Sequence, residues 1–149
     1  LSSKTLDCTA EGVSHSGPVR SFFVYGTLRP GEERHHLLVR HRASFGGAAS
    51  VEGSLLDLLE YPGLVVGGTS ARASGELYAV DDPGSLFAEL DPIETFRGFG
   101  SPGSLYRRAI VWATRPDGTA TLAWTYVYNG RAEGVRTIAS GDWSLRVRP

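Results

Sequence analysis

A chain of 149 residues is long enough to fold as one domain that buries most of its apolar surface. Hydrophobic residues make up 41% of it and include three Trp, six Tyr and six Phe, a composition that excludes a disordered protein. The formal charge of −1 gives no general attraction to nucleic acid or to an anionic membrane surface. We therefore expect a globular protein whose partners include neither nucleic acid nor a membrane.

The N-terminal residues of the given sequence are polar. Cys8 is the one cysteine, which excludes a disulfide framework and favours a reducing compartment. The opening LSSKTLDCTAEGVSHSGP lacks the apolar core of a signal peptide, and apolar runs elsewhere are far shorter than a membrane span. We expect a cytoplasmic protein in which residues 1–19 form a flexible leader and residues 20–149 form a single domain.

The first expected strand, residues 21–25, is a short apolar run that Gly26 ends abruptly. The charged segment GEERHHLLVRHR follows it. This segment predicts a brief surface helix, with Leu37 and Leu38 on its apolar side and Val39 as a further candidate.

Strands interrupted by glycine are expected in the middle of the chain. In residues 43–68, frequent glycines break up β-like runs, which is typical of bulged or tightly curved strands. Residues 72–80 alternate well enough for another strand, with Leu77 facing inward and Ala79 as a second inward candidate. The glycine pattern predicts a small curved sheet or barrel.

A second helix is expected in GSLFAELDPIETF, residues 84–96. Asp82 and Pro83 are start signals, and Pro92 limits or kinks the helix. The apolar positions that recur near helical spacing are Leu86, Phe87, Leu90 and Ile93.

The clearest expected element is a long β-hairpin of residues 104–114 and 119–129, joined by the turn sequence RPDG. In the irregular tail that follows, Trp143 is expected to pack on the sheet. Strands with two short helices between them predict an α+β fold with a curved, largely antiparallel sheet.

The turn after the first strand could bind an anion. Gly26 permits backbone geometry closed to other residues, so the N–H groups of Thr27 and Leu28 could point together at a carboxylate or an oxyanion. A plain turn explains the same residues, and from this segment alone it is the more common case.

Two carboxylates, Asp91 and Glu94, stand three residues apart and share a helix face. Asp91 precedes Pro92 and is interpreted as a cap or turn residue. Glu94 lies between Ile93 and Phe96 in the sequence, where partial desolvation would raise its pKa toward neutrality and suit it to proton transfer. A solvated surface glutamate is the alternative, and most helix glutamates are of that kind.

Three tyrosines, Tyr106, Tyr126 and Tyr128, lie on the two strands of the expected hairpin. Because Tyr126 and Tyr128 share a face, they could line the wall of a pocket and offer hydroxyl groups to a ligand. Cross-strand aromatic residues more often belong to the core, which is the alternative for at least one of the three.

Neither a metal site nor a serine hydrolase is expected. His35, His36 and His41 do not converge on a helix, and no Cys or acidic cluster completes a set of ligands. The sequence contains no Gly-x-Ser-x-Gly elbow, so a Ser/His/Asp hydrolase is not supported.

Six segments together resemble the γ-glutamylcyclotransferase-like family, including its AIG2-like and γ-glutamylamine cyclotransferase branches. The segments are FVYGTLRPG (23–31), YPGL (61–64), GELYAV (75–80), LDPIETF (90–96), LYRRAIV (105–111) and AWTYVY (123–128). Each motif alone is weak evidence, but their order and spacing cover nearly all of residues 21–129.

The resemblance implies a small mixed, mostly antiparallel β-barrel flanked by short helices. By match to the family motifs, the turn at Tyr25, Gly26, Thr27 and Leu28 cradles a γ-glutamyl substrate through backbone N–H groups, and Glu94 is the catalytic glutamate. Further substrate-binding candidates are Tyr61, Tyr106, Tyr126 and Tyr128.

The resemblance also implies the reaction. The expected enzyme cyclises a γ-glutamyl group to 5-oxoproline and releases the attached amine or amino acid, with Glu94 as general acid and base and without a metal, nucleotide or organic cofactor. The glycine-rich loops 46–70 and 97–104 are expected to shape the leaving-group side of the pocket.

Two other functions stay open at this point. The first is a non-catalytic module that binds a small carboxylate in the same cavity. The second is a γ-glutamyl hydrolase or amidotransferase, which needs a nucleophile, and Cys8 in the leader is poorly placed to supply one.

Overall fold

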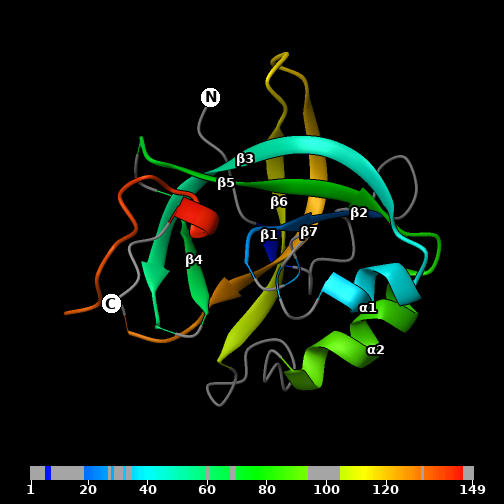
Figure 1. Cartoon of the computed structure of the whole chain (residues 1–149), viewed down its shortest axis with the longest axis horizontal. Coiled ribbons are helices and arrows are strands. Elements are labelled where there is room, and N and C mark those ends of the chain that lie inside the picture. The colour runs from blue at the N-terminus through cyan, green and yellow to red at the C-terminus, as the bar shows by residue number, and fades with distance from the viewer. Residues whose placement is uncertain are drawn as a thin grey trace.

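The computed structural model describes residues 6–7, 19–26, 28, 32, 35–59, 61–67, 70–93, 105–131 and 133–145. Its strands are β1 (Leu6–Asp7), β2 (Ser21–Val24), β3 (Ser44–Asp57), β4 (Pro62–Val66), β5 (Arg72–Ala79), β6 (Tyr106–Thr114) and β7 (Ala120–Tyr128). The helices are α1 (His35–Arg40), α2 (Pro83–Ile93) and the short 3-10 helix η2 (Trp143–Leu145). Figure 1 shows how they are arranged.

Five of the strands close into a barrel. The strand order is β1-β6-β7-β2-β5-β3-β4, and β3 also pairs with β6 where Ser50 faces Thr114, so that β6, β7, β2, β5 and β3 form a ring. The β2–β7 pair, in register at Phe22 and Trp124, is parallel, and the other pairs are antiparallel. The expected mixed, mostly antiparallel barrel is confirmed.

Strand β3 is long and curved, and it serves two partners. It pairs with β5 from Ser44 to Glu52 and with β4 from Gly53 to Asp57, and it arches over the barrel beside β5 (Figure 1). A bulge lies next to Gly47, whose φ of 104° is in the left-handed region that favours glycine.

The prediction of a loop across residues 46–70 is wrong, because most of these residues belong to β3 and β4. The prediction of bulged or tightly curved strands in residues 43–68 is confirmed, because β3 and β4 lie there and β3 has a bulge between Phe45 and Gly47. Residues 97–104, the second predicted loop, lie outside the described part of the chain.

The strand β2 is buried on both faces, which explains its continuous apolar run. Phe23 points into the barrel, where it packs with the inward residues of the other strands. Phe22 and Val24 point outward into a second cluster beneath the helices. The barrel therefore has an inner core and an outer core, and β2 joins them.

The inward face of β5 follows the expected alternation only in part. Leu77 faces the inner core as predicted, but Ala79 is exposed, so its inward assignment is wrong. Ala79 pairs with Ser21 and Ser44 at the ends of their strands, where the barrel wall stops and no interior remains to receive a side chain.

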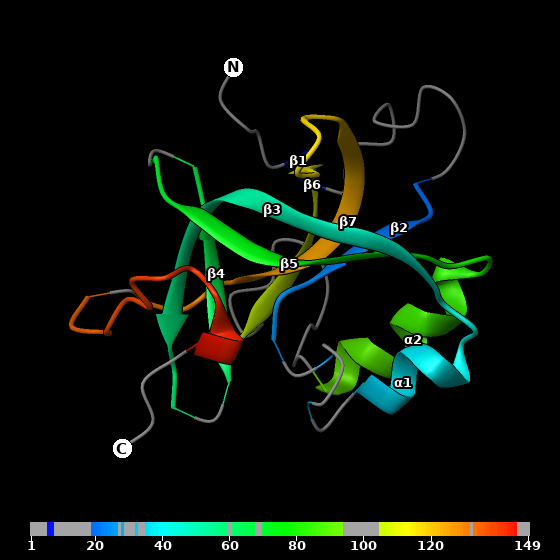
Figure 2. The same cartoon turned by 45° about the horizontal axis from the view of Figure 1, so that its top comes forward.

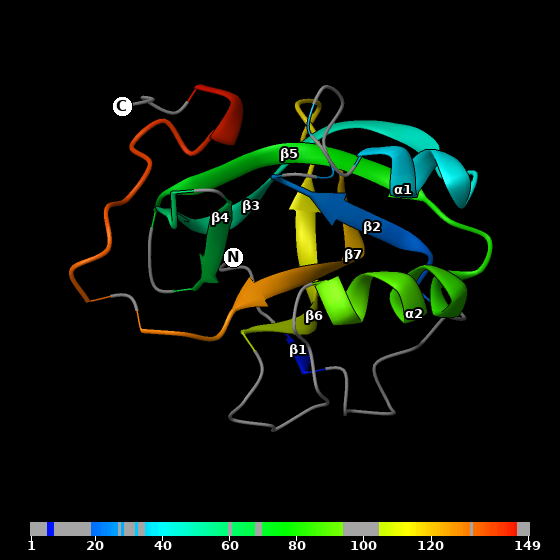
Figure 3. The ribbon, with the colours of Figure 1, turned by 60° about the horizontal axis from the view of Figure 1, so that its bottom comes forward.

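The two α-helices lie next to each other on the outer side of the barrel (Figure 2). Leu37 and Leu38 of α1 are buried as predicted, whereas Val39 is 64% exposed because a helix of six residues presents only a narrow face to the sheet. Helix α2 runs along β2 and β7 (Figure 3). Its start is capped as predicted, since the Ser85 N–H donates to Asp82 Oδ1 at 3.2 Å.

The C-terminal segment returns to the barrel. Trp143 of η2 is 1% exposed within the inner core, so its predicted packing is confirmed. Its Nε1–H donates to Glu32 Oε1 at 3.2 Å, which ties this segment to the stretch that follows β2. Within the predicted leader, β1 pairs with β6 opposite Ala109 and Ile110.

Candidate functional site at one end of the barrel

The turn after β2 lies against the start of β4. A Cβ atom on Gly26 would stand 2.6 Å from Pro62 Cγ and 2.8 Å from Pro62 Cδ, so only glycine fits where the Pro62 ring packs on the turn. The φ of Gly26 is not positive, so space and not a left-handed conformation is the reason for glycine here. Thr27 lies outside the described residues.

Leu28, the last member of the predicted turn, is anchored on the helix side of the barrel. Its side chain is buried in the outer core. Its carbonyl oxygen lies 2.9 Å from Nδ1 of His35, and because the carbonyl can only accept, Nδ1 carries the proton in this contact. The turn is thus held at one end by Pro62 and at the other by the first residue of α1.

Tyr25 points into the barrel and joins three strands. Its hydroxyl donates to the carbonyl oxygen of Tyr126 at 2.6 Å and accepts from the N–H of Leu64 at 3.4 Å. The side chain is therefore part of the inner core, and its hydroxyl links the end of β2 to β7 and β4.

Three of the predicted tyrosines form one cluster beside this turn. The ring centre of Tyr106 lies 6.2 Å from that of Tyr61 and 5.9 Å from that of Tyr128, both in edge-on orientation. The Tyr106 hydroxyl donates to the carbonyl of Pro62 at 2.6 Å, and Gly63 lies against the Tyr128 ring. The YPGL segment is thereby packed against the start of β6 and the end of β7.

Tyr126 connects the turn to the end of α2. Its backbone carbonyl accepts from Tyr25, and its hydroxyl donates to Asp91 Oδ1 at 2.5 Å. The same carboxylate oxygen lies 3.2 Å from Nε of Arg108. The interpretation of Asp91 as a cap or turn residue is wrong, because Asp91 is inside the last turn of α2 and its side chain contacts the sheet.

The described residues of the predicted site therefore gather at one end of the barrel. The segments that meet there are the end of β2, the start of β4, the start of β6, the end of β7 and the end of α2. Glu94 lies outside the described residues and follows Ile93, the last residue of α2.

Sequence reasoning missed Arg108 and the role of Asp91. A signal for Arg108 was present, since period-2 alternation puts it on the same face as Tyr106, and it stands opposite Tyr126 in the hairpin register. Asp91 gave no comparable signal, because an Asp before Pro92 is typical of a turn.

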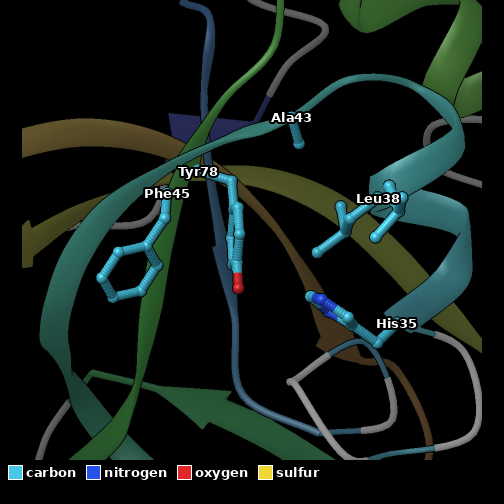
Figure 4. A pocket seen from close by; sticks show the side chains of 6 residues that line it. His35, Leu38, Ala43, Phe45 and Tyr78 are labelled. Atoms are coloured by element: carbon cyan, nitrogen blue, oxygen red, sulfur yellow. The ribbon is translucent and has the colours of Figure 1, made fainter.

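A cavity of about 380 Å³ lies elsewhere, between α1 and the outer faces of β3 and β5 (Figure 4). Its lining residues are His35, Leu38, Val39, Ala43, Phe45 and Tyr78. None of them is a predicted site residue, and its connection to the site is the contact between His35 and Leu28. The lining is mainly apolar and aromatic, which suits an uncharged group.

Two other features are absent from the described ranges. No three or more His, Cys, Asp or Glu side chains in this part of the chain are grouped so as to hold a metal ion. No helix among the same residues has the length and apolar character needed to cross a bilayer.

Comparison with known proteins assigns the family. The sequence model of the family described as "Gamma-glutamyl cyclotransferase, AIG2-like" matches residues 22–145, which include every segment that meets at this end of the barrel. The chain belongs to the AIG2-like γ-glutamyl cyclotransferase family. Membership indicates a γ-glutamylcyclotransferase-like activity on small γ-glutamyl substrates.

Two relatives whose names contain γ-glutamylcyclotransferase or γ-glutamyl cyclotransferase agree with this assignment. A candidate γ-glutamylcyclotransferase of Vibrio cholerae is 39% identical over 125 residues, which are 84% of this chain and 96% of that protein. The γ-L-glutamyl-butirosin B γ-glutamyl cyclotransferase of Niallia circulans is 36% identical over 124 residues, 83% of this chain and 74% of that protein.

A solved structure supports the fold of this AIG2-like chain. The AIG2-like protein of Mus musculus superposes with a TM-score of 0.64 over 89% of this chain and 87% of that chain. At 21% identity, this likeness supports the barrel architecture alone.

Proposed function

We propose that the protein is a γ-glutamyl cyclotransferase that converts a γ-glutamyl compound to 5-oxoproline and a free amine. The observation that carries the proposal is the meeting of three segments at one end of the barrel: the Tyr25–Gly26 turn, the start of β4 at Pro62, and the end of α2 at Asp91. Each of these segments lies in one of the six motifs by which the sequence resembles the family.

The reaction needs one group that both accepts and donates a proton. The α-amino nitrogen attacks the γ-carbonyl carbon of the same glutamyl residue, a C–N bond forms within a five-membered ring, and the bond to the leaving nitrogen breaks. Near pH 7 an α-amino group with a pKa of about 7.7 to 8.0 is mostly protonated and must lose a proton before it attacks. The leaving nitrogen must gain one, so a single carboxyl group between the two nitrogens can serve both steps.

Glu94 is the proposed proton-transfer group. It stands three residues beyond Asp91, so chain length alone keeps the two Cα atoms within about 11 Å of each other. Asp91 in turn contacts Tyr126, whose carbonyl accepts from Tyr25 beside the turn. These contacts connect the end of α2 to the Tyr25–Gly26 turn, which supports the choice of Glu94.

The turn after β2 is proposed to hold the glutamyl group. Its backbone lies against Pro62 with no room for a side chain at Gly26. This close packing supports a site in which main-chain groups of the turn, and not side chains, contact the substrate. Backbone N–H groups of Thr27 and Leu28 would bind the α-carboxylate or the developing oxyanion. Holding the glutamyl chain in the attacking conformer removes much of the entropic cost of ring closure.

The proposal is tested by turnover of a substrate panel. The panel contains γ-glutamyl amino acids and γ-glutamyl amides of larger amines, since the name of the N. circulans relative gives γ-L-glutamyl-butirosin B. Formation of 5-oxoproline by the parent protein is expected, and Glu94→Gln should lower it by about 10²- to 10⁴-fold.

The matched control is Glu89→Gln, which changes a glutamate of the same helix whose carboxylate contacts His41, the residue that follows α1. This variant should turn over as the parent does. Free glutamate as the product would indicate a hydrolase, and tight binding without turnover would indicate a carboxylate-binding module. Either result contradicts the proposed function.

A further inference from the structure

We propose that Asp91 is a positioning residue for Glu94, and that Arg108 and Tyr126 hold the side chain of Asp91 in place. The inference rests on the proposed function, because it assigns a means by which the proton-transfer group is placed. Asp91, Arg108 and Tyr126 are called the α2 clamp below.

The carboxylate of Asp91 is held from two strands at once. Its Oδ1 accepts from the Tyr126 hydroxyl on β7 at 2.5 Å and lies 3.2 Å from Nε of Arg108 on β6. The side chains of Arg108 and Asp91 are 18% and 22% exposed, so water screens the pair only partly. A hydroxyl bound to a carboxylate at this distance is a charge-assisted contact, about twice as strong as a neutral one.

Arg108 is itself fixed by two aromatic rings. Its guanidinium carbon lies 4.3 Å from the ring centre of Phe87 and 5.7 Å from that of Trp124. Phe87 precedes Asp91 by four residues on α2, so both side chains lie on the face that meets the hairpin. One arginine thereby fastens two successive turns of α2 to β6 and β7.

The end of α2 needs such external contacts. Pro92 lies within the helix and has no N–H to donate to the carbonyl of Ala88, one turn earlier. The last turn is therefore short of one backbone hydrogen bond, and its position depends more than usual on side-chain contacts. Glu94 follows this turn by one residue.

The α2 clamp also reaches the turn that is proposed to hold the substrate. The backbone carbonyl of Tyr126 accepts a hydrogen bond from the Tyr25 hydroxyl, and the Tyr126 hydroxyl donates one to Asp91. One residue thus sets the spacing between the end of β2 and the end of α2, which are the two sides of the proposed site.

Loss of the clamp should lower catalysis more than substrate binding. A displacement of about 1 Å at a reacting group can cost about 10²-fold in rate. We expect Asp91→Asn to lower kcat by about 10- to 100-fold with KM changed by less than about 3-fold, the pattern of a lost transition-state contribution. Tyr126→Phe, which removes only the hydroxyl, should show the same pattern with a smaller loss.

A double-mutant cycle tests whether Asp91 acts through Glu94. The turnover rate at saturating substrate, followed as 5-oxoproline released, is measured for the parent, Asp91→Asn, Glu94→Gln and the double variant. If Asp91 only positions Glu94, Asp91→Asn should have little further effect once Glu94 is replaced. An additional loss of about 10-fold in the double variant would mean that Asp91 acts independently, and it would overturn the inference.

Two further results keep the test decisive. Arg108→Lys retains the charge but not the planar fork, so it should recover part of the kcat that Arg108→Gln loses. The positioning role of the α2 clamp would be refuted if Tyr126→Phe and Asp91→Asn both fold and both have the parental kcat. The proposed function would then still stand. Absence of 5-oxoproline formation by the parent protein would instead refute the proposed function itself.

Discussion

Gly26→Ala introduces one methyl group where the turn after β2 packs on the Pro62 ring of β4. The new carbon would lie 2.6 Å from Pro62 Cγ, and ordinary contact begins near 3.4 Å, so the turn or the Pro62 ring must move by about 0.8 Å. The proline ring cannot swing away as a flexible side chain would, and the carbonyl of Pro62 is also bound by the Tyr106 hydroxyl. The strain therefore spreads to the turn itself.

The expected cost has two parts. Overpacking of this kind destabilises a protein by about 1–3 kcal/mol, measured as a lower midpoint of urea unfolding. A shift approaching 1 Å in the turn should also lower the catalytic efficiency, kcat/KM, by up to about 10²-fold. The loss of kcat/KM should be larger than the decrease in the folded fraction of the protein could explain.

The matched control is Gly84→Ala in the exposed first turn of α2. A Cβ there would be 3.5 Å from Asp82 Oδ1, an ordinary contact, and alanine in a helix is favoured over glycine by about 0.5–1 kcal/mol. Parental stability and turnover in Gly26→Ala would refute the argument that contact with the Pro62 ring is the reason for glycine at this position.

Other substitutions test the packing around the site. Trp143→Ala removes the largest fully buried side chain of the inner core. It should lower the free energy of unfolding by about 3–5 kcal/mol in urea titrations, and a loss below about 1 kcal/mol would contradict the core assignment. Tyr25→Phe leaves the Tyr126 carbonyl without this donor and should cost about 1–3 kcal/mol, read from thermal unfolding by circular dichroism. The pKa of Glu89 is lowered, chiefly by the hydrogen bond from His41, so this contact stabilises the fold above pH 4.5 and its contribution is lost as pH falls through the lowered pKa. Glu89→Gln should accordingly be less stable than the parent at neutral pH and equal to it in acid, and a stability gap that persists at low pH would contradict this cause.

Elements with a local cause were predictable from the sequence. The hairpin was expected from two alternating runs around RPDG, and β6 and β7 pair along their whole lengths. The start of α2 was expected from Asp82 and Pro83, and the capping bond from Ser85 is present. In each case the residues that specify the element are neighbours in the chain.

Features that depend on distant segments were not predictable from local patterns. The contact between Ser50 and Thr114 that closes the barrel joins residues with no sequence signal in common. The alternation of inward and outward residues in β5 predicted an inward Ala79. Its side chain is exposed because it pairs with Ser21 and Ser44 at the end of the barrel wall. Asp91 was misinterpreted because its partner Arg108 lies on β6, which comes after residues 94–104 in the sequence.

The candidate site residues were predicted mainly through family motifs. Gly26 was expected to adopt a special backbone conformation, whereas its neighbour Pro62 is what requires glycine. The motifs YGTL and YPGL appeared as separate signals, and only the folded chain brings them into contact. Glu94 and Thr27 stay predictions, since both lie outside the described residues.

The parallel pairing of β2 with β7 has a consequence for biosynthesis. Tyr25 and its acceptor Tyr126 are 101 residues apart, so β2 leaves the ribosome long before the strand that completes its second edge. Until then its unpaired backbone is a template for pairing with other chains, which is the condition that chaperones relieve. A nascent chain stalled before residue 120 should therefore bind a chaperone, and release should follow once the last strand has emerged.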